Sequence, residues 1–343
     1  MRRAQGGFKP PPLPEAACAW SKAAPLPQKR PSPSVKPLLG IALKVLSALV
    51  FTVMSAGIKH VSAGYPTGEI VFFRSAFAIV PLLAWLAWRG DLVNSVRTSN
   101  LSGHLLRGII SSCGMFSGFV ALAYLPLSDA IAIGYASPLI VVVLASLVLG
   151  ETVRGYRWTA VTLGFLGVLI MLMPHLSGGA FAAGLAGGPA VGAMFALLGA
   201  VCSAGATIQV RRLLATERTG AIVLYFSLMT TALGLCTIVL GWRMPGGAEF
   251  ALLVLIGVLG GVGQILLTQS YRYADASLVA PFEYTTMVWA FLIGWFAFGQ
   301  VPQQAVVAGA AIVATAGLFV LWREHRLGLA REKAVEAGSQ RPA

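Results

Sequence analysis

The sequence predicts an all-α integral membrane protein whose ten transmembrane helices form two inverted five-helix repeats. Three observations lead to this prediction. The chain of 343 residues is 57% hydrophobic but only 11% charged, its apolar residues fall into ten runs, and a nine-residue motif recurs in the second half. An ordinary soluble domain carries about 25% charged residues. Most of this chain is therefore expected to lie in lipid or against other apolar helices.

The ten apolar runs lie between two basic tails. Residues 1–37 are rich in proline and basic side chains and contain no apolar run, so we expect a disordered tail. Each run is about as long as a helix needs to be to cross a bilayer, roughly 20 residues. Residues 323–343 form a second basic tail, expected in the cytoplasm. The approximate bounds of the runs are 38–59, 69–88, 103–124, 128–149, 155–174, 190–211, 219–241, 249–270, 278–299 and 303–322.

The two halves of the chain resemble each other. The longest connector, around Ser177 to Pro189, separates residues 38–174 from 190–322, and we expect one five-helix repeat in each. Thr67–Ser75 reads TGEIVFFRS and Thr219–Ser227 reads TGAIVLYFS, which gives five identities in nine positions at an offset of 152. Since each half has an odd number of spans, corresponding helices run in opposite directions. Inverted repeats of this kind are typical of secondary transporters.

Two further sets of matches follow the same division. The offset of 152 also pairs Lys59 with Arg211, at the ends of the first and sixth runs. A weaker set at an offset of 149 pairs residues of the third and fourth runs with residues of the eighth and ninth. These are Gly108, Gly114, Tyr124, Ser128 and Gly150 with Gly257, Gly263, Tyr273, Ser277 and Gly299.

The positive charge predicts the orientation of the chain. A net charge of +13 is compatible with nucleic-acid binding, but the Lys and Arg residues lie in the tails and between apolar runs, so we expect the lipid bilayer rather than nucleic acid as a partner. With the N-terminus in the cytoplasm, 22 of the 25 Lys and Arg residues fall on the cytoplasmic side and three, Lys59, Arg74 and Arg243, on the other. The positive-inside rule therefore predicts that both termini are cytoplasmic.

Glu283 is the sharpest candidate for a functional residue. It is the one ionisable residue in the apolar stretch Ala280 to Gly299, which we expect to form one spanning helix beginning near Pro281. A carboxylate at membrane depth costs about 2.5 kcal/mol or more, and it usually faces a cavity or a partner. Glu283 could bind a cationic group, carry a proton, or serve only as a structural hydrogen-bond partner.

Other polar and aromatic residues in the runs are weaker candidates. Arg74 could bind an anionic group, pair with Glu69, or extend to the interface. Tyr135 and Pro138 interrupt the fourth run, where a proline can free a backbone carbonyl and kink the helix. Trp289 could stack on a flat substrate or simply pack.

Helical spacing groups the remaining candidates. Gln264, Thr268 and Tyr271 lie on one face of the eighth run, which suggests either a cavity wall or hydrogen bonds between helices. A polar face of the first run is also expected to look inward. Its residues are Lys44, Ser47, Phe51, Ser55 and Lys59.

Several motifs place the chain beside a known family. They are FFRS in the second run, LLRG at Leu105–Gly108, SP in the fourth run followed by LGE at Leu149–Glu151, and APFEY at Ala280–Tyr284. With these motifs, residues 38–322 resemble the EamA-like carriers of the drug/metabolite transporter superfamily. The second half departs from the pattern, since Gln300 stands where a glutamate would echo Glu151. The resemblance implies a central cavity, alternating access and a bacterial inner-membrane location, and it adds Tyr284 to the candidates for substrate binding.

The expected function is secondary active transport of a small organic metabolite. The resemblance implies uptake of S-adenosylmethionine or riboflavin, or efflux of an amino acid or other metabolite, as examples. A passive channel and a membrane-embedded enzyme are the alternatives, although the sequence has no ATP-binding loop, His/Glu metal cluster or Ser/His/Asp set. No cofactor is expected, and a homodimer is an arrangement that the sequence allows.

Overall fold

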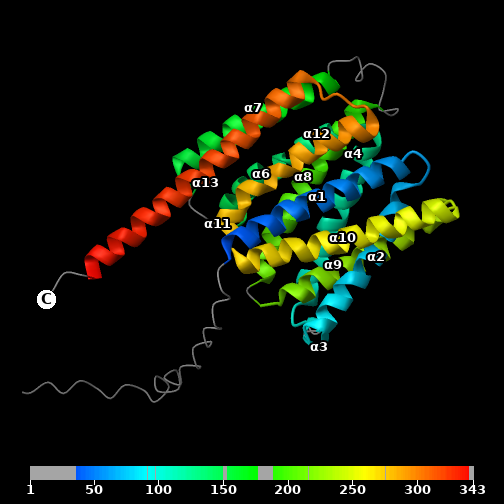
Figure 1. Ribbon diagram of the computed structural model, residues 1–343, viewed down its shortest axis with the longest axis horizontal. Coiled ribbons are helices and arrows are strands. Elements are labelled where there is room, and N and C mark those ends of the chain that lie inside the picture. The colour runs from blue at the N-terminus through cyan, green and yellow to red at the C-terminus, as the bar shows by residue number, and fades with distance from the viewer. Residues whose placement is uncertain are drawn as a thin grey trace, which may run out of the picture. The chain divides into compact units, whose positions relative to one another are not determined.

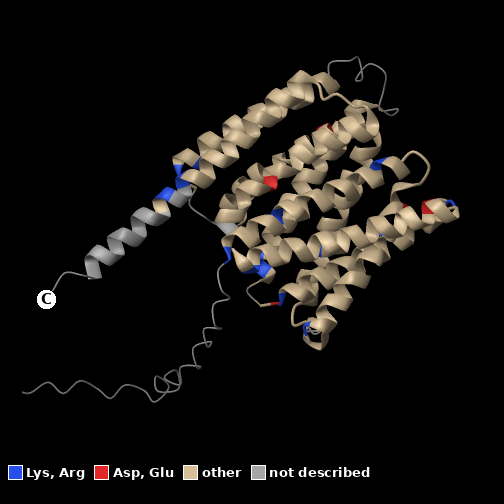
Figure 2. Cartoon of the chain, in the orientation of Figure 1, with Lys and Arg blue, Asp and Glu red and all other residues tan. Residues whose placement is uncertain are grey.

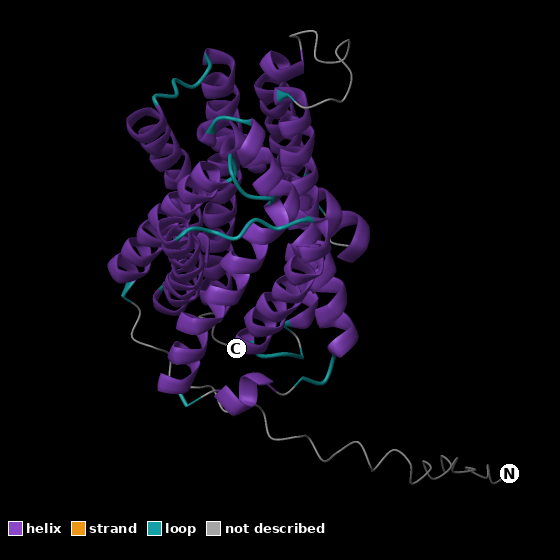
Figure 3. Ribbon diagram, turned by 90° about the vertical axis from the view of Figure 1, so that its right-hand side faces the viewer, coloured by secondary structure: helices purple, strands orange, loops and turns teal. Residues whose placement is uncertain are grey.

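The protein is described by a computed structural model that covers residues 36–90, 92–96, 98–149, 153–176, 188–214, 216–274 and 276–339. Within these ranges all regular structure is helical (Figure 3). The predicted N-terminal tail, apart from its last two residues, and Glu151 lie outside the described residues.

The helices follow the predicted runs closely. The first half contains α1 (Pro37–Val61), α2 (Thr67–Trp88), α3 (Leu92–Val96), α4 (Leu101–Tyr124), α5 (Leu127–Gly134), α6 (Ala136–Leu149) and α7 (Gly155–Leu176). The second contains α8 (Pro189–Leu213), α9 (Thr219–Cys236), η2 (Thr237–Leu240), α10 (Gly247–Tyr273), α11 (Ala276–Val279), η3 (Ala280–Tyr284), α12 (Thr285–Phe298) and α13 (Gln304–Ser339). Among the described residues, nine helical stretches are long and apolar enough to span a membrane, and α11, η3 and α12 together occupy the remaining predicted run, the ninth.

Two of the predicted spans are broken. The fourth is interrupted at Tyr135, between α5 and α6. The ring of Pro138 lacks an N–H and crowds the carbonyl four residues earlier, that of Gly134, where α5 ends. The prediction of one continuous helix over 280–299 was wrong, because Ala280–Tyr284 form a 3₁₀ turn around Pro281 and α12 begins only at Thr285.

The last helix is longer than predicted. The expected span ended at residue 322, but α13 continues to Ser339. Its extension is rich in Ala, Glu, Lys, Arg and Leu, which are strong helix formers. The apolar part that could cross a membrane is Gln304–Arg323, so the remainder is a polar helical continuation of the span.

The long helices pack in pairs that join the two halves of the sequence. α1 lies along α10, α4 along α8, α2 along α9, and α7 along α13 (Figure 1). Glycines allow close approach at two of these seams. The ring of Phe51 lies against Gly263, and a Cβ on Gly167 would come within 2.8 Å of the Gly309 carbonyl oxygen, so α7 and α13 touch backbone to backbone.

Charged residues gather toward the ends of the helices, and most of the ribbon between them carries none (Figure 2). The bundle has two ends, and each is named here after one basic residue that lies at it. The Lys59 end holds the carboxyl ends of α1 and α4 and the amino ends of α2 and α5. The Arg211 end holds the carboxyl ends of α8 and α10 and the amino ends of α9 and α11.

Candidate functional site

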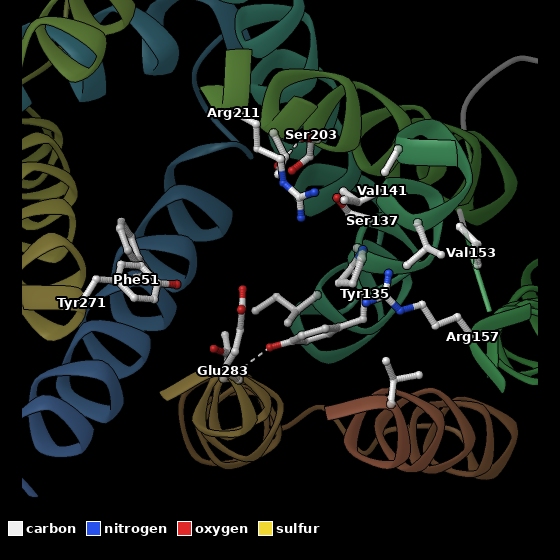
Figure 4. Close-up of a pocket in the computed structure, with 18 residues that line it drawn as sticks. Phe51, Tyr135, Ser137, Val141, Val153, Arg157, Ser203, Arg211, Tyr271 and Glu283 are labelled. Carbon is white, nitrogen blue, oxygen red and sulfur yellow. Dashed lines mark hydrogen bonds between the residues drawn. The ribbon is translucent and has the colours of Figure 1, made fainter. Parts of the chain in front are cut away.

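A cavity of about 780 Å³ lies in the half of the bundle toward the Arg211 end. Its wall is built from both halves of the sequence, with contributions from α1, α5, α6, α7, α8, α10, η3, α12 and α13 (Figure 4). A volume of this size suits a small organic molecule. The polar residues that line it are Tyr135, Ser137, Arg157, Ser203, Thr207, Arg211, Tyr271, Glu283 and Thr286.

Glu283 faces this cavity from η3. Its Oε2 lies 3.6 Å from Nζ of Lys44, which stands on the inward-facing side of α1 as the sequence predicted. The Lys44 side chain is 6% exposed, whereas that of Glu283 is 54% exposed. The Lys44 ammonium also lies 5.6 Å from the centre of the Tyr271 ring, within reach of a cation–π attraction. The carboxylate therefore faces both a buried lysine and the cavity, where it remains open to a ligand.

The two helix breaks meet at a pair of tyrosines. Tyr135, at the break between α5 and α6, donates a hydrogen bond of 2.7 Å to the backbone carbonyl of Glu283 in the other break. Its ring stacks on that of Tyr284, with centroids 5.2 Å apart and planes 23° from parallel. Irregular backbone at membrane depth must find hydrogen-bond partners within the protein, and the Tyr135 hydroxyl supplies one.

Tyr284 lines a smaller chamber of about 190 Å³ beside the main cavity. This chamber shares Tyr135, Arg157 and Glu283 with the main cavity and lies between α6, α7, α13 and η3. The Tyr284 hydroxyl rests against Gly317 of α13, where no larger residue would fit without a shift. Among the candidates from the sequence, the structure thus gathers Glu283, Tyr135, Tyr271 and Tyr284 in one region.

Two arginines of the wall were not predicted as site residues. Arg157 comes from α7 and Arg211 from α8, and both side chains point into the cavity (Figure 4). In the sequence they were counted only as charges that orient the chain. The match of Arg211 to Lys59 was a signal that could have drawn attention to it.

Four of the predicted candidates lie apart from Glu283. Gln264 and Thr268 border a separate small pocket formed with residues of α2 and α9, and the Thr268 hydroxyl donates to the Gln264 carbonyl within α10. Arg74 is buried in α2 against Gly260 of α10. Trp289 is half-buried in α12. Neither Arg74 nor Trp289 is among the residues that line the main cavity.

The Lys59 end is held together by polar contacts. Lys59 Nζ donates to the carbonyl oxygens of Leu122, at 3.1 Å, and Leu125, at 2.5 Å. Nε2 of His175 lies 3.2 Å from Oδ2 of Asp129, and the two side chains are 3% and 0% exposed. These contacts tie the carboxyl end of α1 to that of α4, and the carboxyl end of α7 to α5.

A second polar cluster lies at the Arg211 end, outside the spans. Oε1 of Glu217, between α8 and α9, accepts hydrogen bonds from Thr98, Ser99 and Asn100. Its Oε2 lies 3.6 Å from Nε2 of His104. Burial acts to raise the pKa of the Glu217 carboxyl, but the hydrogen bonds together outweigh it and lower that pKa to about 2. The cluster fixes the α8–α9 connection to the start of α4.

Comparison of the sequence with known protein families shows which family the chain belongs to. The sequence profile of the EamA-like transporter family matches residues 38–173 and 190–322. The chain belongs to the EamA-like transporter family. This confirms the resemblance found in the motifs, and it makes the protein a multi-pass membrane protein of transporter type.

Relatives of this chain are named for the transport of different metabolites. The S-adenosylmethionine uptake transporter of Rickettsia prowazekii is 27% identical over 84% of this chain and 94% of its own length. The pseudopaline exporter CntI of Pseudomonas aeruginosa PAO1 is 34% identical over 81% of this chain and 94% of its own. The riboflavin transporter of Rhizobium johnstonii is 29% identical over 84% and 93%. All three are named as transporters, and the predicted class of function, a metabolite transporter, is confirmed.

Solved structures share the fold of this chain, and one of them serves as an example. A chain described only as "Crystal structure of protein" matches with a TM-score of 0.59 and 21% identity, over 84% of this chain and 98% of that one. At this identity the likeness supports the fold alone.

Proposed function

We propose that the protein is a secondary active transporter that carries a small organic metabolite across the bacterial inner membrane by alternating access. The cavity is the observation that carries this proposal. It extends from Glu283 and Tyr135, at the two helix breaks, to Val153 and Arg211 near the ends of their helices. Its lining thus reaches the Arg211 end, whereas in the described part of the chain the Lys59 end is held by the contacts given above. A binding site open to one side of a membrane is what one state of such a carrier requires.

The proposal includes two inverted repeats, 38–174 and 190–322, and the packing supports them. A Cβ on Gly108 of α4 would meet Met229 of α9, and a Cβ on Gly257 of α10 would meet Phe77 of α2. The glycines are separated by the offset of 149 and their neighbours by the offset of 152. Each contact is therefore the counterpart of the other.

The central tyrosines support the same relation. Tyr135 and Tyr284 are 149 residues apart, lie at the breaks of the fourth and ninth spans, and stack on each other. Two equivalent residues that touch are expected beside the axis of a two-fold relation. The pairs α1 with α10 and α4 with α8 exchange under the same relation.

The orientation follows from charge. Since 22 of the 25 Lys and Arg residues belong to one side, the positive-inside rule assigns the Arg211 end, and with it both termini, to the cytoplasm. The described state then faces inward. The relatives named for S-adenosylmethionine, riboflavin and pseudopaline include an uptake transporter and an exporter. These compounds are therefore the first substrates to test, and the measurement decides the direction of transport.

Transport by purified protein in proteoliposomes tests the proposal. Radiolabelled S-adenosylmethionine, riboflavin and a panel of amino acids are supplied at a range of concentrations. A carrier gives saturable flux and exchange of internal for external substrate, whereas a passive channel gives flux that rises linearly with concentration. Linear flux would contradict alternating access. Flux of no compound in a panel widened to pseudopaline would contradict the transporter assignment for this chain.

A further inference from the structure

We propose that Arg211 is the functional counterpart of Lys59, and that it closes the Arg211 end by binding backbone carbonyls at the carboxyl end of α10, as Lys59 binds those of α4. This inference rests on the proposed alternating access. In the outward-facing state the carbonyl oxygens of Tyr271 and Ala274 receive the Arg211 guanidinium.

The contact made by Lys59 is the observed half of this pair. Its Nζ donates to the carbonyls of Leu122 and Leu125 across the seam between α1 and α4. Since α4 ends at Tyr124, these carbonyls belong to its last turn and C-cap, where no intrahelical donor reaches them. A cation there is also favoured by the helix dipole. Lys59 thus joins two helix ends and seals one end of the bundle.

Arg211 stands at the equivalent position on its helix. Lys59 lies two residues before the last residue of α1, Val61, and Arg211 lies two residues before the last residue of α8, Leu213. The offset is 152, the same as that of the repeated nine-residue motif.

The carbonyls have counterparts as well. α4 ends at Tyr124 and α10 at Tyr273, which are 149 residues apart. The same offset carries Leu122 to Tyr271 and Leu125 to Ala274. The acceptors are backbone atoms, so the change of side chain between the halves does not remove them.

The described state keeps these two partners apart. Arg211 and Tyr271 both line the cavity, and Figure 4 shows them on different walls with open space between them. Closing this end brings the carboxyl end of α10 toward α8. A guanidinium has five N–H donors in a planar fork and can bind two carbonyl oxygens at once. Any contacts that Arg211 makes in the open state are exchanged for these on closing.

If the two cations hold opposite ends shut, their removal shifts the equilibrium in opposite directions. Two reporters measure this in protein whose native cysteines are replaced. Thr207→Cys lies in the cavity and is exposed in the described state, and Ala130→Cys is buried near the Lys59 end. Labelling by an impermeant maleimide in sealed vesicles of each orientation gives the ratio of the two open states.

We expect Lys59→Gln to lower the ratio of labelling at Thr207→Cys to labelling at Ala130→Cys about tenfold. We expect Arg211→Gln to raise the same ratio about tenfold. A shift of this size corresponds to the loss of one charge-assisted hydrogen bond. The double variant is expected to return near the wild-type ratio. The matched controls Lys59→Arg and Arg211→Lys keep a cation and should retain the wild-type ratio, which also separates a lost anchor from a folding defect.

The proposal is overturned if Arg211→Gln leaves the ratio unchanged or shifts it in the same direction as Lys59→Gln, or if Arg211→Lys behaves like Arg211→Gln. Failure of the proposed function looks different. In that case wild-type protein shows no saturable transport, and Ala130→Cys stays unlabelled in every variant while Thr207→Cys labelling never changes.

Discussion

The two ends of this helix bundle use related residues for different purposes. At the Lys59 end, a lysine at the end of α1 binds the carbonyls of a neighbouring helix, and the buried Asp129–His175 pair adds a second contact. At the Arg211 end, an arginine at the equivalent place on α8 lines a cavity of about 780 Å³ beside Glu283. The difference teaches that polar residues alone do not distinguish the two ends, since both ends carry them and only their arrangement differs.

The largest effect is expected at the open end. Glu283→Gln keeps size and hydrogen bonding but removes the negative charge that faces Lys44 and the cavity. We expect transport to fall about tenfold or more, since a contact to a charged group contributes about 1.5–3 kcal/mol. Initial rates in proteoliposomes measure this, with Glu249→Gln, an exposed acid of α10 outside the cavity, as the matched control. Wild-type rates in Glu283→Gln would make Glu283 a structural residue.

Thiol labelling tests directly whether the two ends of the bundle differ in accessibility. In protein without its native cysteines, Ser203→Cys in the cavity wall should react at least about tenfold faster than Ala132→Cys, which is fully buried in α5, because reactivity follows exposure. Time courses with an impermeant maleimide give both rates. Equal rates at the two positions would mean that the ends do not differ in the way described.

The buried pair at the closed end should contribute to stability. Asp129→Asn deprives His175 of its carboxylate partner and is expected to lower the free energy of unfolding by about 1–3 kcal/mol, the usual cost of an unsatisfied buried polar group. Thermal unfolding in detergent measures the loss. A double-mutant cycle with His175→Asn isolates the pair, and additive single effects would show that the two residues do not stabilise each other.

The smallest effect is expected at the Glu217 cluster. Its carboxyl pKa falls from an ordinary 4.5 to about 2, so its charged form stabilises the native state above pH 4.5, and this stabilisation is lost as the pH falls toward 2. Glu217→Gln should therefore cost about 1 kcal/mol at pH 5 and less at pH 3. Melting temperatures of the two proteins at both pH values measure the difference. A gap that widens on acidification would contradict the direction of the pKa shift.

The sequence predicts the helices well because each span needs a long apolar run, and every predicted run coincides with a helical stretch. It indicated the break of the fourth span, at Tyr135 and Pro138, but it did not predict the break of the ninth. Pro138 and Pro281 signal a disturbance, but whether a proline kinks a helix, ends it or begins it depends on which neighbours satisfy the freed backbone. Here the neighbour is Tyr135, whose hydroxyl reaches the carbonyl of Glu283, 148 residues away.

The site was predicted only in part for a similar reason. Glu283 was conspicuous, since a carboxylate in an apolar run is rare. Gln264, Thr268 and Tyr271 share one face of α10, yet the structure directs Tyr271 into the main cavity and the other two toward α2 and α9. Helical spacing shows which residues lie on one face, but a long helix passes different neighbours along its length. Arg157 and Arg211 carry no sequence signal that separates a cavity wall from an interfacial anchor.

The backbone contact between Gly167 and Gly309 has a practical consequence. α7 and α13 lie backbone to backbone there, and the side chains of Met171 and Val313 flank the contact, so we expect the two helices to move together. Spin labels on the exposed faces of these two helices, for example at Leu166 and Leu318, would form a fixed internal reference. Distances from this reference to labels on other helices would then show how each of those helices moves relative to the α7–α13 pair.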